Sequence, residues 1–203
     1  MTRFLIGCAL IFTVFSQATL AIAQERQGGR RSQAAPGKEA PHPPKVEADA
    51  PNFELKNLDD KVISLKGLAE QGPVVMLVLR GWPGYQCPIC NRQVGEFLSK
   101  KAEFEKAGAS VLMIYPGPAD LLAEHAKEFQ GAKEFPKHFY YVIDPDYTFT
   151  NAWGLRWEAP RETAYPSTFV ISKDLKVKFG VISTSHGGRT SAVDVLKELE
   201  KLQ

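Results

Sequence analysis

The stretch PVVMLVLRGWPGYQCPIC, residues 73–90, joins an apolar run, a short loop and a pair of cysteines. The run from Pro73 to Leu79 contains no charged residue, which is typical of a strand buried on both faces of a sheet. Cys87 and Cys90 follow the loop, and apolar residues then recur at helical spacing. This order predicts a central strand, a loop and a helix that begins at the cysteines.

Two thiols at the start of a helix are suited to redox chemistry. The unpaired N–H groups and the positive end of the helix dipole favour thiolate over thiol, so we expect Cys87 to be the nucleophile. Cys90 lies one turn further along and is predicted to be more buried, where it would resolve the product on Cys87 as a disulfide. Pro88 lacks an N–H group and suits the first turn.

Other uses of a Cys-x-x-Cys pair fit the sequence less well. A structural disulfide here would close a very small loop and remove little entropy from the unfolded chain. A zinc site normally has four ligands, and no second Cys-x-x-Cys or His-x-x-x-His accompanies this pair. Covalent attachment of c-type haem requires a histidine after Cys90, where Asn91 stands.

The first residues of the 203-residue chain are typical of a signal peptide. Arg3 precedes an apolar stretch, Phe4 to Phe15, and Ala-Ile-Ala at 21–23 forms a small-x-small cleavage site. We expect residues 1–23 to be a signal peptide, removed with Cys8, and the protein to be exported to the periplasm or another extracytoplasmic space. The alternative is an uncleaved leader, which would be the protein's only contact with a membrane.

Composition divides the remainder into two parts. Residues 24–50 are rich in Gly, Pro, Ala and charged residues and show no periodicity, which predicts a disordered linker. Residues 51–203 are predicted to form one domain with 19 basic and 19 acidic residues. A neutral domain argues against nucleic-acid binding, which needs a basic face.

Strands and helices alternate along this domain. A small hairpin is expected at 53–65, and the capping-box sequence SAVD at 191–194 opens a last helix. The alternation predicts an α/β sandwich around a mixed sheet. Further strands are expected at 111–114, 139–143, 168–171 and 177–181, and further helices from the cysteines to Gly108, at 119–129 and at 149–153.

The chain resembles the thioredoxin fold in having Cys-Pro-x-Cys between strand and helix and YPSTFVI, residues 165–171, before the last hairpin. Within that fold it is most similar to the alkyl hydroperoxide reductase and thiol-specific antioxidant branch, the peroxiredoxin-like proteins. The similar segments are APNFEL at 50–55, RGW at 80–82, Asp144 and AWGL at 152–155. The resemblance covers residues 50–203. It implies a thioredoxin-like sandwich, with a central mixed β-sheet flanked by helices and an N-terminal β-hairpin extension.

The resemblance also implies a function. The chain would be a thiol-dependent oxidoreductase with antioxidant activity, in which the Cys87 thiolate reduces a peroxide and Cys90 resolves the product. An external thioredoxin-like dithiol would restore the pair, with no metal or organic cofactor. The alternative enzyme is a disulfide reductase or oxidase that acts on extracytoplasmic thiols. A copper-binding module that uses both thiols and His186 is the alternative without catalysis, since soft thiolates suit Cu(I).

The sequence departs from the family at two places. Typical peroxiredoxins carry Pro-x-x-x-Thr-x-x-Cys, and here Arg80 stands at the Pro position and Gly84 at the Thr position. The hydroxyl that polarises the peroxide is therefore absent from its usual place. The arginine that the family carries just before the Thr-Phe-Val-Ile strand, residues 168–171, falls on Pro166-Ser167.

Arg80, Tyr85 and Pro166 are the other residues expected at the site. The Arg80 guanidinium could hold a thiolate or a peroxide oxygen by charge-assisted hydrogen bonds, or it could form a structural ion pair. Tyr85 and Trp82 are expected to wall the loop, or simply to pack as aromatic side chains usually do beside a central strand. The resemblance implies that Pro166 is a cis-proline that faces the cysteines.

Overall fold

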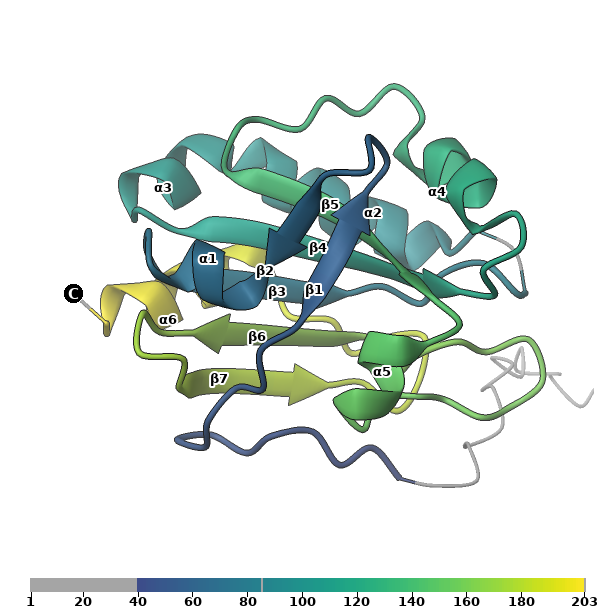
Figure 1. Ribbon diagram of the computed structural model, residues 1–203. Helices are drawn as coiled ribbons and strands as arrows, with labels where there is room; N and C mark the ends of the chain where they lie inside the picture. Colours follow the sequence, from purple (N-terminus) through teal and green to yellow (C-terminus); the bar gives the residue numbers. More distant parts are fainter. Residues whose placement is uncertain (1–39, 85, 203) are drawn as a thin grey trace, which may run out of the picture. The chain divides into compact units, whose positions relative to one another are not determined.

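The computed structural model describes residues 40–84 and 86–202, whose centre is a seven-stranded mixed sheet (Figure 1). The strands lie in the order β2-β1-β5-β4-β3-β6-β7. The pairs β3–β4 and β4–β5 are parallel, and the other pairs are antiparallel. The strands are β1 (Glu54–Asn57), β2 (Val62–Ser64), β3 (Val74–Val78), β4 (Ser110–Gly117), β5 (Phe139–Pro145), β6 (Ser167–Ile171) and β7 (Val177–Ile182). The helices are α1 (Leu65–Ala69), α2 (Pro88–Ser99), α3 (Lys101–Lys106), α4 (Leu122–Gln130), α5 (Thr148–Ala152) and α6 (Ala192–Glu200).

Strand β3 lies inside the sheet between β4 and β6, and all five of its side chains are buried. Val75 and Leu77 face the core beneath α2, α3, α4 and α6, whereas Met76 and Val78 face the core beneath α1 and α5. Each such side chain contributes roughly 1.5–3 kcal/mol by burial. The apolar run therefore anchors both faces of the sheet.

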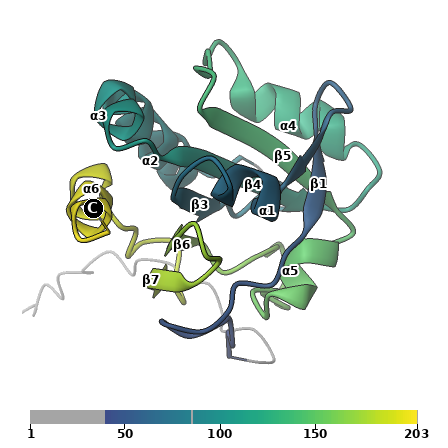
Figure 2. The ribbon, with the colours of Figure 1, turned by 60° about the vertical axis from the view of Figure 1, so that its left-hand side comes forward.

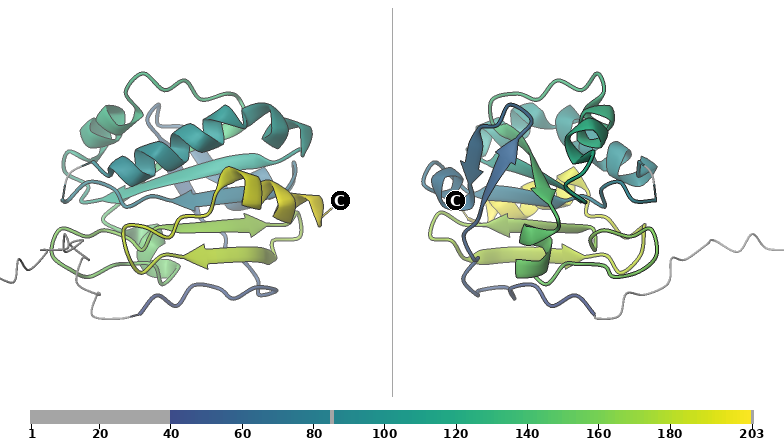
Figure 3. Two further views of the ribbon diagram at one scale, coloured as in Figure 1. Left: turned by 180° about the vertical axis from the view of Figure 1, so that it is seen from behind. Right: turned by 45° about the vertical axis from the view of Figure 1, so that its right-hand side comes forward.

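The helices cover the two faces of this sheet in separate groups. Helices α1 and α5 lie in front of it in Figure 1, and α2 and α6 lie in front when it is seen from behind in Figure 3. Figure 2 separates α3 and α6 from β1 and α5. The sandwich and its mixed sheet confirm the predicted fold class. None of the helices in the described ranges is long and apolar enough to cross a bilayer.

The predicted N-terminal hairpin is present and extends the sheet. Strands β1 and β2 pair with Leu55 opposite Ile63, and β1 then pairs with β5 through Lys56 and Ile143. Leu55 and Ile63 are buried in the core beneath α1. The hairpin therefore belongs to the same core as the central strand.

The last part of the predicted linker, residues 40–50, is not free of the domain. Its backbone runs beside β7, where Glu47 N donates to Val177 O at 2.7 Å and Ala50 N to Leu175 O at 2.8 Å (Figure 1). Two ion pairs, Lys176 with Asp49 and Lys178 with Glu47, hold the same segment. The polar groups at the edge of β7 explain this contact, which composition does not predict. The predicted signal peptide, residues 1–23, and residues 24–39 lie outside the described residues.

The expected cis-proline is wrong, because the bond between Tyr165 and Pro166 is trans. The backbone on both sides is extended and hydrogen-bonded: Tyr165 N donates to Leu155 O at 2.8 Å, and Pro166 O accepts from Ser183 N at 2.9 Å. A trans bond keeps the longer Cα spacing that this extended path needs. The sequence resembles a cis-proline turn, but these hydrogen bonds to Leu155 and Ser183 hold the backbone extended up to the start of β6.

The chain leaves β3 through Gly81, which has a φ of +73°. A Cβ atom at this position would collide with the carbonyl oxygen of Pro116. Glycine is therefore required here both by its backbone conformation and by the closeness of the end of β4.

We expect Gly81→Ala to lower the free energy of unfolding by roughly 2–5 kcal/mol, through backbone strain and overpacking. Gly95→Ala is the matched control, because a Cβ atom at this exposed position of α2 meets nothing within 4 Å. It should raise the stability by about 0.5–1 kcal/mol. Urea denaturation measures both changes, and equal stabilities for the two variants would contradict the role of Gly81.

Candidate functional site

Cys87 is the N-cap residue of α2. Its backbone is extended, with φ −83° and ψ 110°, and its Sγ accepts a hydrogen bond from Cys90 N at 3.4 Å. Pro88 occupies the first turn, as expected for a residue without an N–H group. The thiol therefore sits where the unpaired N–H groups of the helix point.

The two thiols are both free and differ in their environments. Cys87 is 3% exposed and Cys90 is fully buried. The pKa of Cys87 falls to about 5, chiefly because the Cys90 thiol donates a hydrogen bond to it; this outweighs burial, and Arg189 helps. The pKa of Cys90 is raised, first by burial and then by its hydrogen bond with Cys87. At neutral pH the pair therefore holds a thiolate on Cys87 and a thiol on Cys90.

Arg189 is the cation at the thiols, and the sequence analysis did not single it out. Its Nη2 lies 3.3 Å from Cys90 Sγ and 3.8 Å from Cys87 Sγ. Its Nη1 donates to Gln93 Oε1 at 3.2 Å, and its Nε donates to the carbonyl of His186 at 3.3 Å. The available signal was its position between the Gly187-Gly188 pair and the capping box of α6, where the chain returns toward α2.

Arg80 approaches the thiols through its backbone instead of its side chain. Its N–H donates to Cys90 Sγ at 3.4 Å. Its guanidinium pairs with Glu162, with Nε 2.5 Å from Oε2 and Nη2 3.1 Å from Oε1. Burial lowers the pKa of Arg80 and the bonds to Glu162 raise it, with a net rise. Of the two roles considered for this side chain, the geometry is that of the ion pair.

Glu162 joins this cluster although no sequence pattern marked it. Its side chain is 3% exposed, and its Oε1 also lies 2.8 Å from Nε2 of His186. His186 is therefore engaged by a carboxylate instead of reaching the thiols as a third metal ligand. Among residues 40–84 and 86–202, no three His, Cys, Asp or Glu side chains are grouped as a metal site would need.

The loop between β3 and α2 packs against α4. Gln86 Nε2 donates to His125 O at 2.8 Å, and its Oε1 accepts from the Tyr115 hydroxyl at 2.9 Å. Trp82 lies on the His125 ring, with 4.2 Å between the ring centroids. Tyr85, predicted to wall the site, lies outside the described residues.

Gly84 stands where the family's threonine would be. A Cβ atom there would come within 3.0 Å of the Arg161 side chain and of Arg80 Nη2. A threonine would force Arg161 or Arg80 to shift. Gly84 therefore lacks the hydroxyl of a threonine, and the loop that contains Arg161 packs closely against it.

Pro166 connects the site to the turn that carries Arg189. Its carbonyl accepts from Ser183 N, at the start of the segment 183–189. Its backbone thus supports that turn, and its predicted role toward the substrate stays a prediction.

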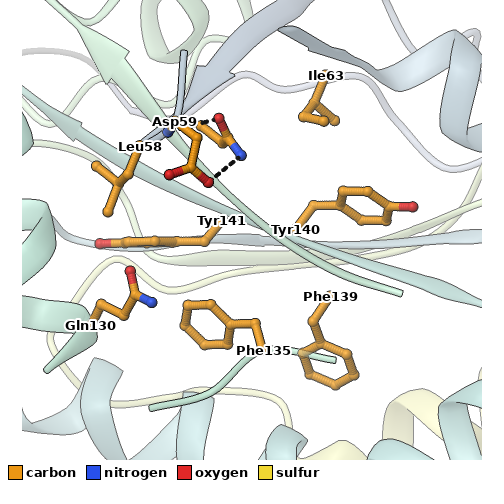
Figure 4. A pocket seen from close by; sticks show the side chains of 9 residues that line it. Leu58, Asp59, Ile63, Gln130, Phe135, Phe139, Tyr140 and Tyr141 are labelled. Atoms are coloured by element: carbon orange, nitrogen blue, oxygen red, sulfur yellow. Dashed lines mark hydrogen bonds between the residues drawn. The ribbon is translucent and has the colours of Figure 1, made fainter. Parts of the chain in front are cut away.

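A separate hollow of about 270 Å³ lies between the β1–β2 turn and β5 (Figure 4). Phe135, Phe139 and Tyr141 line it, and so do Asn57 and Asp59, which are hydrogen-bonded to each other. None of the thiol-site side chains lines this hollow.

The chain matches a family model described as "AhpC/TSA family" over residues 46–179. It is 30% identical over 129 residues to chloroplastic peroxiredoxin Q of Triticum aestivum and 29% identical over 130 residues to that of Oryza sativa subsp. japonica. Each match covers 64% of this chain and 55% of the relative, so the chain spans about half the length of these relatives.

Solved structures of peroxiredoxins share the fold. Peroxidoxin BcpB of Mycobacterium tuberculosis matches with TM-score 0.60 and 22% identity, covering 79% of this chain and 99% of that one. A peroxiredoxin-like protein of Aquifex aeolicus matches with TM-score 0.63 and 16% identity, covering 84% and 91%. A yeast mitochondrial 1-Cys peroxiredoxin, described as resolved through glutathione and thioredoxin systems, matches with TM-score 0.63 and 17% identity, covering 78% and 76%.

Alkylation of Cys87 tests its environment. Because its pKa is lowered to about 5, the reaction rate should level off above about pH 6, whereas an ordinary thiol, with a pKa of about 8.5, gains rate up to about pH 9.5. Cys90→Ala removes the donated hydrogen bond and should raise the midpoint, with a reaction at pH 5 that is about five- to sixfold slower for the first unit of rise. Cys90→Ser keeps a donor and should stay near wild type. An alkylation midpoint near pH 8 in the wild type, or equal midpoints in Cys90→Ala and Cys90→Ser, would contradict a lowered pKa of Cys87 that depends on the Cys90 thiol.

Proposed function

The chain belongs to the AhpC/TSA family and has the thioredoxin fold of the peroxiredoxin-like proteins, and on that premise we propose that it is a thiol-dependent peroxidase. The supporting observation is the Cys87 sulfur at the start of α2, with its pKa lowered to about 5 and Arg189 beside it. A thiolate is the nucleophile in thiol chemistry, and this site provides one at neutral pH.

In the proposed first step, the Cys87 thiolate attacks one oxygen of a hydroperoxide. An S–O bond forms and the O–O bond breaks, which leaves a sulfenic acid on Cys87 and an alkoxide or hydroxide that takes a proton to leave as alcohol or water. Sulfur is oxidised by two electrons and the peroxide is reduced by two.

Arg189 supplies the electrostatic support for this step. Its guanidinium can donate charge-assisted hydrogen bonds to the thiolate and to the oxygen that gains negative charge. In this proposal Arg189 supplies the positive charge that other family members carry on an arginine near the start of β6. This chain has Pro166 and Ser167 at that place. With Gly84 at the threonine position, the donors at the sulfur are this arginine, the Cys90 thiol and the backbone N–H groups of Ile89 and Cys90.

Cys90 is the proposed resolving cysteine. Its thiol attacks the sulfenic sulfur of Cys87, so that a disulfide forms and water leaves. Three residues of an α-helix rise about 4.5 Å, which lies within the Cα separation of disulfides, roughly 4.4–6.8 Å. The pair can therefore close at the start of α2 without unwinding the helix.

An external dithiol is the proposed electron donor. Thiolate attack on the Cys87–Cys90 disulfide, followed by the donor's second thiol, returns both cysteines to the reduced form. A thioredoxin-like protein fits this role, as in the yeast relative described with thioredoxin systems. The cycle needs no metal or organic cofactor.

A second function, exchange with disulfides of other proteins, is favoured by Gly84. The site has the dithiol that exchange needs and lacks the hydroxyl that typical peroxiredoxins direct at peroxide. The copper-binding alternative has the least support. Arg189 lies against both sulfurs and His186 is bonded to Glu162.

Trapping of the oxidised cysteine distinguishes peroxidase activity from disulfide exchange. Cys90→Ser treated with hydrogen peroxide and a sulfenic-acid reagent should be labelled at Cys87 far faster than a free thiol. The wild type should instead form the intramolecular disulfide. Arg189→Met should slow the labelling roughly hundredfold, a typical effect of losing one preorganised donor, while Arg92→Met, on an exposed position of α2, should not.

The contrary outcome is equally specific. Labelling no faster than that of a free thiol, together with rapid reduction of insulin disulfides by the wild type, would replace peroxidase action with disulfide exchange. Cys87→Ser is the control for both assays and should be inactive in each.

Export is also part of the proposal and is supported by the sequence of residues 1–23. Expression with this leader in a bacterial host should yield an extracytoplasmic protein whose mass corresponds to a start at Gln24. A chain that keeps its leader and stays in the cytoplasm would contradict export.

A further inference from the structure

Glu162 is a buried carboxylate shared by two segments that are far apart in the sequence. Arg80, after β3, donates to both of its oxygens, and Nε2 of His186, after β7, lies 2.8 Å from Oε1. A carboxylate can only accept, so Nε2 carries the proton in this contact. The proposed peroxidase steps make no use of Glu162, which leaves its burial unexplained by the reaction.

The turn at residues 183–189 connects Glu162 to the thiols. The Ser183 hydroxyl closes this turn by bonding to the carbonyls of Ser185 and Gly187. The carbonyl of His186 accepts from Arg189 Nε at 3.3 Å, while Gln93 accepts from Nη1. The Arg189 side chain is thus oriented by His186 on one side and by α2 on the other.

We propose that Glu162 is a positioning residue for the thiol pair, which fixes the 183–189 turn through His186 and so holds Arg189 against Cys87 and Cys90. The inference rests on the proposed role of Cys87 as the attacking thiolate. The His186 side chain is 33% exposed, so water would replace the carboxylate if Glu162 did not face it. Glu162 is instead only 3% exposed and is held by Arg80, so it gives His186 a fixed partner and keeps the 183–189 turn in one place.

Both donors that reach the Cys90 sulfur come from segments held by Glu162. One is the backbone N–H of Arg80, and the other is the guanidinium of Arg189. Substitution of Glu162 would disturb both and would leave the buried Arg80 charge unpaired, which is strongly destabilising. His186 is therefore the better residue to change, because it lies only on the Arg189 side.

The test compares His186→Phe with His186→Gln. Phenylalanine retains a ring against Trp157, which the histidine contacts edge-on with centroids 5.6 Å apart, but it has no donor for Glu162. Glutamine retains a donor. The measured quantity is the pH midpoint of Cys87 alkylation, followed by mass spectrometry. This readout needs no peroxide, so it is independent of whether the peroxidase proposal holds.

His186→Phe should raise the midpoint, with alkylation at pH 5 slowed about three- to tenfold, which corresponds to a rise of roughly 0.7 to 1.3 pKa units. His186→Gln should stay within about twofold of wild type. His138→Ala is the control, because it also removes a histidine hydrogen bond, to Lys101 O at 2.9 Å, and should leave the midpoint unchanged. An unchanged midpoint in His186→Phe would overturn the proposal.

A double-mutant cycle with Arg189→Met shows whether His186 acts through Arg189. If it does, His186→Phe should have no further effect on the midpoint once Arg189→Met is present. Effects that add in the double variant would show an independent contribution of His186 and would also overturn the proposal. Circular dichroism checks that each variant is folded, and His186→Ala serves as a second donor-free variant.

Discussion

The first turn of every α-helix has N–H groups without partners inside the helix, and in α2 the Cys87 sulfur accepts one of them. This single hydrogen bond joins the fold to the chemistry. The helix starts here because β3 and its loop deliver an extended residue followed by Pro88, and the same start favours negative charge on sulfur. The buried Cys90 thiol then adds the largest stabilisation of that charge. The helix cap and the proposed nucleophile are therefore one group.

The two arginines near the thiol pair differ in their partners. The charge of Arg80 is neutralised by a carboxylate, whereas Arg189 is bonded to neutral acceptors and to the sulfurs. Arg80 is paired with Glu162, so its side chain contributes structure, while its backbone contacts Cys90. Arg189 is held by neutral acceptors, the Gln93 amide and the His186 carbonyl, and keeps its charge for the sulfurs. A buried carboxylate bonded directly to Arg189 would have weakened this effect on the thiolate. The separation of roles explains how two arginines can occupy one small region.

The sequence pattern predicts those parts of the structure that depend on periodicity. The uncharged run before Arg80 specified β3, and the cysteines marked the start of α2, because burial and helix capping leave local signals. Glu162 and Arg189 were missed because they lie in irregular loops, where no spacing indicates which way a side chain turns. The trans bond at Pro166 escaped for a related reason, since the pairing of its neighbours with Leu155 and Ser183 is set by tertiary structure. The local motif located the thiols, but the charged residues around them are brought there by tertiary contacts between distant loops.

The segment at residues 47–50 has a consequence for the behaviour of the protein in solution. A strand at the end of a sheet offers unpaired N–H and C=O groups to any extended chain nearby. At the start of β7 these groups already bond to the protein's own backbone, and Lys176 and Lys178 are fastened to Asp49 and Glu47. At the other end of the sheet, β2 is only three residues long. The start of β7 and the short β2 thus leave few unpaired backbone groups with which an extended segment of another chain could pair.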